Sequence, residues 1–195
     1  MTIEKELLRT LREETGAGIV DIQRALDAVG DDPKKAVELL RKQGKKIAEK
    51  KSERTAREGV IGAYVHTNGK VAAFVALACE TDFVARNDGF RELAHDLALH
   101  VVAANPAYLS QADIPDEILN KEREIAHDQA QHEGKPEKII EKIVAGKMEK
   151  YFAEHCLLLQ PFVKDDTVTI QELLERATAK IGEKIELKRF VRMQL

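Results

Sequence analysis

The sequence has no hydrophobic run long enough to cross a membrane. Its longest uninterrupted apolar run covers residues 71–79, whereas a helical span needs about 20 residues. The first six residues lack the basic and apolar regions of a secretory signal. We therefore expect no membrane partner and predict a cytoplasmic protein.

Cysteine is also scarce, since the 195 residues contain only Cys79 and Cys156. The two are far apart and form no Cys-x-x-Cys pair. They are predicted to be reduced, buried thiols. His155 precedes Cys156, but a predicted helix leads directly into three leucines there, which favours a structural cysteine over a nucleophile.

Motifs that assemble an active site are missing. There is no His-Glu-x-x-His and no Walker-type Gly-Lys-Ser/Thr. Two pairs of histidines, 95 with 100 and 127 with 132, are five residues apart, a spacing that does not align them for a metal. Gly16-Ala17-Gly18 lacks the third glycine of a dinucleotide fingerprint and is interpreted as a helix-entry turn with positive φ. We predict a binding protein rather than an enzyme, with no catalytic residues, metal or cofactor.

No excess of one charge indicates a nucleic-acid partner, because 31 basic and 34 acidic residues give a net charge of −3. Residues 41–57 are the local exception, with eight basic and two acidic residues and thus a net charge of +6. Two interpretations remain. A partly helical, solvated linker is favoured because no aromatic residue lies among the basic ones. The alternative is a segment that binds RNA such as ribosomal RNA, and such a complex would weaken steeply with salt.

Residues 1–44 have the apolar periodicity of three short helices. Gly30 can close the second helix in a left-handed cap, and Asp32-Pro33 begins the third as N-cap and first helical residue. Gly44 is predicted to end it. The inward residues of the first two helices are expected to be Ile3, Leu7, Leu8, Leu11, Ile19, Ile22, Leu26 and Val29.

From residue 58 onward the pattern predicts an α+β domain, an antiparallel sheet with helices segregated to one face. Residues 60–66 and 70–79 flank Asn68-Gly69, which favours a type I′ hairpin turn. The second strand is apolar throughout, so both its faces are expected to be covered. Helices follow to about residue 155, and Thr169-x-x-Glu172 is a capping box that begins another. Residues 185–188 alternate as a strand, whereas residues 156–163 fit a helix tail or a short strand. The predicted division is a module at 1–44, a basic linker at 45–57 and a core domain at 58–195.

One segment, residues 80–87 with the sequence Glu-Thr-Asp-Phe-Val-Ala-Arg-Asn, joins the buried strand to the next helix. Phe83 and Val84 could be core residues at this corner, and Thr81 could cap a turn. The sequence of residues 80–87 resembles the signature of the elongation factor Ts family. Three other blocks, at residues 14–21, 158–165 and 181–185, are similar to family blocks and stand in family order.

The resemblance covers the whole chain and implies a specific function. It implies a guanine-nucleotide exchange factor for elongation factor Tu, with a ubiquitin-associated-like N-terminal module and a dimerisation-type core. Thr81, Asp82, Phe83 and Val84 would act at the Mg²⁺ end of the partner's nucleotide site, Phe83 as an apolar wedge. The single short core implies a homodimer.

The resemblance also implies that the N-terminal module docks on the partner through Leu11, Ile19 and Val20. Ile19-Val20 stands where the family commonly has two methionines. Val20 falls on the polar side of its helix, which supports an exposed contact, whereas Leu11 is central in the inward stripe. Core and contact therefore remain open for Leu11.

Overall fold

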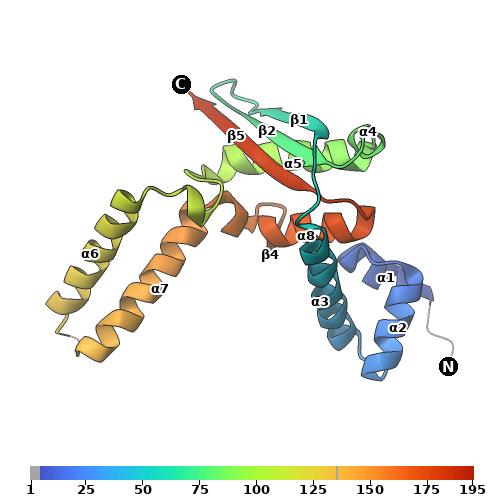
Figure 1. Ribbon diagram of the computed structural model, residues 1–195, viewed down its shortest axis with the longest axis horizontal. Coiled ribbons are helices and arrows are strands. Elements are labelled where there is room, and N and C mark those ends of the chain that lie inside the picture. The colour runs from blue at the N-terminus through green and yellow to red at the C-terminus, as the bar shows by residue number, and fades with distance from the viewer. Residues whose placement is uncertain (1–4, 135) are drawn as a thin grey trace.

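The computed structural model describes residues 5–134 and 136–195. It combines helices with a small antiparallel sheet, which confirms the predicted α+β class (Figure 1). In chain order the elements are α1 (Lys5–Thr15), α2 (Ile19–Val29), α3 (Pro33–Lys51), β1 (Glu58–Val65), β2 (Val71–Cys79), α4 (Asp82–Ala85), α5 (Asp88–Ala104), η1 (Gln111–Asp113), α6 (Asp116–His132), α7 (Glu137–His155), η2 (Leu157–Leu159), β3 (Pro161–Phe162), β4 (Asp165–Thr169), α8 (Ile170–Ile181) and β5 (Glu186–Gln194).

Local capping chemistry sets the end of α2 and the start of α3. The Asp32 carboxylate accepts hydrogen bonds from the N–H groups of Lys34 and Lys35, and Gly30 closes α2 with φ of 70°. Ile22 and Leu26 are fully buried in the hydrophobic cluster of this module. Ile19 was expected on the same stripe, but it is 46% exposed at the first turn of α2, so that expectation is wrong. Ile3 lies outside the described residues.

Helix α3 does not end at Gly44 as predicted but continues to Lys51. Gly44 faces α8, and a Cβ placed on it would lie 3.6 Å from Cβ of Ala179, an ordinary packing contact. Tertiary packing therefore offsets the low helix propensity of glycine at this position. The first part of the basic segment is helical. The division at residues 44 and 57 stays a prediction, although separate hydrophobic clusters lie on either side of the segment.

The main sheet has the order β1-β2-β5, with antiparallel pairing throughout and β2 in the centre. The β1–β2 hairpin forms as predicted, but its turn is not type I′. The Gly69 N–H donates to the His66 carbonyl at 2.8 Å. Among the described turn residues only Gly69 has a positive φ, 66°. The longer loop needs the left-handed conformation at one residue only, so Asn68 keeps a negative φ.

Only one face of this sheet is covered, which corrects the expectation for β2. Helix α5 packs on the face that carries Ala73, Val75 and Leu77, and approaches so closely that a Cβ on Gly62 would collide with the Ala94 backbone. No other described element covers the opposite face (Figure 1). Its exposed apolar residues are Ile61, Ala63, Val65, Phe74, Val191 and Met193.

Helices α6 and α7 form an antiparallel hairpin that projects from the sheet domain, at the left in Figure 1. The segment after α7 combines both predicted alternatives, a short 3₁₀ turn (η2) followed by the two-residue strand β3. Cys79 and Cys156 are free and fully buried, as predicted. The Thr169–Glu172 capping box forms at the start of α8, also as predicted.

Candidate partner-binding site

Phe83 is the most exposed aromatic side chain among the described residues, at 80% exposure. It lies on α4, a four-residue helix between β2 and α5. The interpretation of Phe83 as a core residue is therefore wrong. Val84 is half-buried against the hydrophobic core, and Ala85 is buried. Phe83 thus projects into solvent from a turn whose other side is anchored.

Capping interactions hold both ends of this turn. The Thr81 hydroxyl accepts a hydrogen bond from the Val84 N–H at 3.5 Å, and Asp82 forms an ion pair of 2.9 Å with Arg86. Asn87 caps the next helix by accepting from the N–H of Gly89 at 2.9 Å. These local hydrogen bonds and the ion pair anchor the turn from which the exposed aromatic ring projects.

Glu183 and Glu80, two carboxylates about 100 residues apart in sequence, accept reciprocal hydrogen bonds at the start of this turn. Glu183, just after α8, accepts from the N–H groups of Glu80 and Thr81 at 3.1 and 3.0 Å, and from the Thr81 hydroxyl at 2.7 Å. In return, the Glu80 carboxylate accepts from the Lys184 N–H at 2.6 Å. This bond, together with Arg54 at 3.4 Å, lowers the pKa of Glu80. Sequence analysis placed Glu183 in the family block at residues 181–185 but gave it no role, since no local pattern reveals contacts across about 100 residues.

The N-terminal module presents a second exposed apolar patch. Ile19 and Val20, at the start of α2, are 46% and 58% exposed. Leu11 is only 2% exposed and lies in the module's hydrophobic cluster, which favours its core alternative. Helices α2 and α4 both lie at the right-hand end of the molecule in Figure 1. The structure therefore brings the two predicted contact regions to the same end of the chain's long axis.

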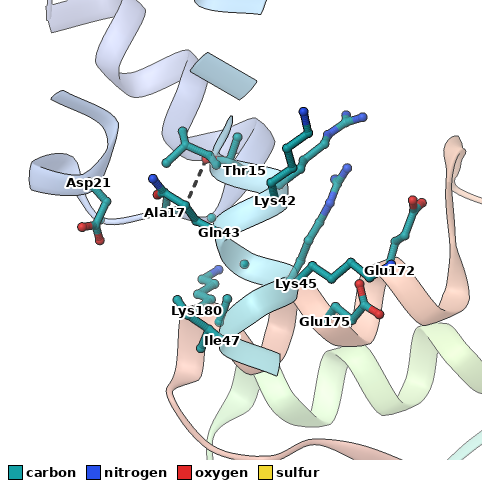
Figure 2. Close-up of a pocket in the computed structure, with 17 residues that line it drawn as sticks. Thr15, Ala17, Asp21, Lys42, Gln43, Lys45, Ile47, Glu172, Glu175 and Lys180 are labelled. Carbon is teal, nitrogen blue, oxygen red and sulfur yellow. Dashed lines mark hydrogen bonds between the residues drawn. The ribbon is translucent and has the colours of Figure 1, made fainter. Parts of the chain in front are cut away.

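A cavity of about 550 Å³ lies between the N-terminal module and α8, beside the points where the two are in contact (Figure 2). The Gly16–Gly18 loop forms one wall, and Gly16 has the predicted positive φ, 69°. The aliphatic stem of Lys180 packs against Gly16. Charges of both signs line the cavity, among them Lys42, Lys45, Lys180, Asp21, Glu172 and Glu175. None of the residues 81–84 reaches it.

Arg176 on α8 and Lys51 on α3 join the N-terminal module and its third helix to the sheet domain, while Arg41 on α3 pairs within the module. Arg41 contacts the Glu14 carboxylate at 3.5 Å, and Arg176 on α8 donates to the Glu14 carbonyl at 3.4 Å. Burial and the nearby Arg41 charge lower the pKa of Arg176. At the other end of α3, Lys51 donates to the carbonyl of Gly182, the C-cap of α8. Part of the basic segment is thus engaged within the chain.

The part of the chain that the structure describes shows no cluster of three or more side chains placed to hold a metal ion. Within the same residues, none of the helices combines the length and hydropathy that a membrane crossing requires.

Comparison with known proteins decides the family. A sequence model described as "Elongation factor TS" matches residues 19–195. The chain belongs to the elongation factor Ts family. Among its relatives, the elongation factor Ts of Thermotoga petrophila is 49% identical over the whole chain and 97% of that protein. That of Moorella thermoacetica is 47% identical over 96% of this chain and 93% of its own length. That of Carboxydothermus hydrogenoformans is 47% identical over 99% of this chain and 89% of its own.

Proposed function

We propose that this protein is a guanine-nucleotide exchange factor that binds elongation factor Tu in the cytoplasm and promotes GDP release during translation elongation. Membership of the elongation factor Ts family supports the partner. The observation that carries the proposal is the 80% exposure of Phe83 on an anchored turn, within the family's signature segment. The protein itself performs no chemical step on the nucleotide.

Residues 81–84 are the part of the protein that disturbs the nucleotide site of elongation factor Tu. A GTPase holds its nucleotide through a backbone cradle, a lysine and a Mg²⁺ that bridges phosphate oxygens. The apolar ring of Phe83 wedges between partner side chains near the Mg²⁺, and Asp82 presents a carboxylate to the mobile elements there. Thr81 and Val84 hold the turn from which both project. Since charges in such a site are poorly screened, small displacements weaken the hold on GDP.

The N-terminal module provides the docking contact on the partner's nucleotide domain. Ile19 and Val20 form its apolar patch, and their exposure supports this role. Thermodynamic linkage requires that the factor and GDP each weaken the other's binding to elongation factor Tu by the same factor.

We further propose that two copies of the chain pair through the uncovered face of the β1-β2-β5 sheet. Ile61, Val65 and Met193 on this face are more than 60% exposed, and Phe74 lies near its centre. Antiparallel sheets pack face to face through such apolar surfaces. A second copy offers the same flat apolar surface, so pairing about a two-fold axis matches like with like.

The deciding experiment measures release of labelled GDP from elongation factor Tu. Catalytic amounts of this protein should accelerate release, and the protein alone should hydrolyse no GTP. An unchanged release rate at micromolar concentrations of the protein would refute the proposal.

A further inference from the structure

We propose that Glu183 is a positioning residue for nucleotide exchange, because its carboxylate fixes the backbone from which Phe83 projects. The inference rests on the proposed function and assigns a role to a residue outside the signature segment. Glu183 is half-buried and lies directly after Gly182, the left-handed C-cap of α8.

The geometry accounts for both oxygens of this carboxylate. Oε2 accepts the N–H groups of Glu80 and Thr81, while Oε1 accepts the Thr81 hydroxyl. These donors come directly before α4, at the point where β2 has ended and its ladder no longer satisfies the backbone. Charge-assisted hydrogen bonds of this kind are short and directional, so Glu183 sets where α4 begins and how it is oriented.

The contacts of Glu183 with Glu80 and Thr81 are connected to the rest of the molecule through two further sets of contacts. The Glu80 carboxylate accepts a hydrogen bond from the Lys184 N–H, so the two segments hold each other reciprocally. Arg54 contacts Glu80, and Lys51 donates to Gly182, so the C-terminal end of α3 joins the same cluster. The basic segment therefore supports the turn that carries Phe83, and α3 connects this turn to the N-terminal module.

A wedge acts only when it enters at the correct angle, and errors of about 1 Å can cost up to a hundredfold in rate. Loss of the Glu183 contacts should therefore lower the maximal exchange rate more than the affinity for elongation factor Tu, which the N-terminal patch retains. A purely structural role would lower the stability of the free protein and leave the folded fraction fully active.

The test compares three substitutions at one position. Glu183→Ala removes every contact, and exchange should fall about tenfold or more. Glu183→Gln keeps the reach and an acceptor oxygen for both backbone N–H groups, so it should retain most activity. Glu183→Asp keeps the charge but withdraws the carboxylate by one methylene, so it should resemble Glu183→Ala. An active Asp variant beside an inactive Gln variant would overturn positioning in favour of charge alone. These two conservative variants also serve if the alanine variant does not fold.

A double-mutant cycle with Phe83→Ala supplies the sharper readout. If Glu183 acts through Phe83, Glu183→Ala should cause little further loss of exchange once Phe83 is truncated. Additive losses would overturn the inference. Amide hydrogen exchange at Glu80 and Thr81 should also be faster in Glu183→Ala than in the wild type. Unchanged protection of these two amides would likewise contradict the inference.

Asp113→Ala is the matched control. Asp113 also accepts one backbone N–H and one hydroxyl, both from Ser110, at 2.8 and 2.6 Å, but it lies just before α6, away from α4. The Asp113→Ala variant should leave the rate of nucleotide exchange unchanged. If the wild-type protein fails to accelerate GDP release, the proposed function fails. If the wild type is active and Glu183→Ala is equally active, only the present inference fails.

Discussion

The ring of His100 and the side-chain amide of Gln160 form a hydrogen bond of 3.0 Å in the core, where both residues are almost fully buried. The Val163 N–H donates to Nδ1 of His100 at 3.2 Å. Nδ1 is therefore unprotonated, and Nε2 donates its proton to the Gln160 oxygen. Gln160 in turn donates to the Glu154 carbonyl at 2.7 Å, so this chain of bonds joins α5 to the end of α7.

This network predicts a pH-dependent stability. Burial of the ring lowers the pKa of His100, and the hydrogen bond to Gln160 opposes this effect in part. The unfolded chain takes up this proton at about pH 6.5, before the folded protein does. The stability should therefore be full above about pH 6.5 and decline below it, until the pH reaches the lowered pKa of the folded state. Denaturant unfolding between pH 8 and 5 measures the effect.

His100→Asn is the informative variant for that experiment. It keeps an acceptor for the Val163 N–H but no longer titrates. It should be less stable than wild type at pH 8, and its unfolding free energy should depend less on pH between 7 and 5. An equally steep profile would show that other groups cause the dependence.

Phe83→Ala should separate function from stability. Aromatic anchors at interfaces contribute about 2 kcal/mol or more, so exchange efficiency should fall about thirtyfold. The free protein should melt at nearly its original temperature, since Phe83 is 80% exposed. Ile139→Ala, an exposed apolar residue on α7, is the control for both assays. A large fall in melting temperature with normal activity of the folded protein would contradict the wedge.

Val20→Asp should weaken the association with elongation factor Tu without unfolding the module. Val20 is 58% exposed, so the free protein tolerates a carboxylate there. In a docked complex the buried, unpaired charge costs more than about 1.4 kcal/mol, which corresponds to about a tenfold loss of affinity. Ala28→Asp, on the exposed side of the same helix, is the matched control for titration binding. Equal affinities for the two variants would place the docking contact elsewhere.

Phe74→Glu should disrupt the proposed homodimer. Light scattering of the wild type at micromolar concentration should give about twice the chain mass of 21.9 kDa. The variant should give a single chain mass with little loss of monomer stability, because Phe74 is 44% exposed in one chain. Ile125→Glu on α6 starts from a similar exposure of 41% and should remain dimeric. If the monomeric variant still exchanges nucleotide fully, pairing is not required for exchange.

Local chemistry made much of this fold predictable. Asp32, Gly30 and Thr169 act as caps because each satisfies backbone groups within a few residues, and such signals lie in short stretches of sequence. The prediction that α3 ends at Gly44 was wrong because the helix continues against α8, a contact with residues more than 100 positions away.

At the sheet and at the candidate site, long-range contacts determine the structure, so the sequence alone could not predict it. The apolar sequence of β2 is the same whether a helix or a second copy of the chain covers Phe74, so periodicity cannot tell which. On α4, Ala85 is buried while Phe83, two residues before it, is exposed, and only the packing of this short helix shows which of them faces the core. The contacts of Glu183 with Glu80 and Thr81 form because β2 and α8 end at the same place.

The α6–α7 hairpin has a practical consequence. Neither helix contributes to the two hydrophobic clusters of the described residues, and the hairpin projects away from α2 and α4 (Figure 1). Gly134, with φ of 70°, closes α6 near the tip. A fluorophore attached at a cysteine introduced at the neighbouring, exposed Glu133 would leave both hydrophobic clusters and the proposed contacts on α2 and α4 untouched. The hairpin is thus a position from which a fluorophore can report on assembly by energy transfer or anisotropy, away from the proposed exchange site on α4.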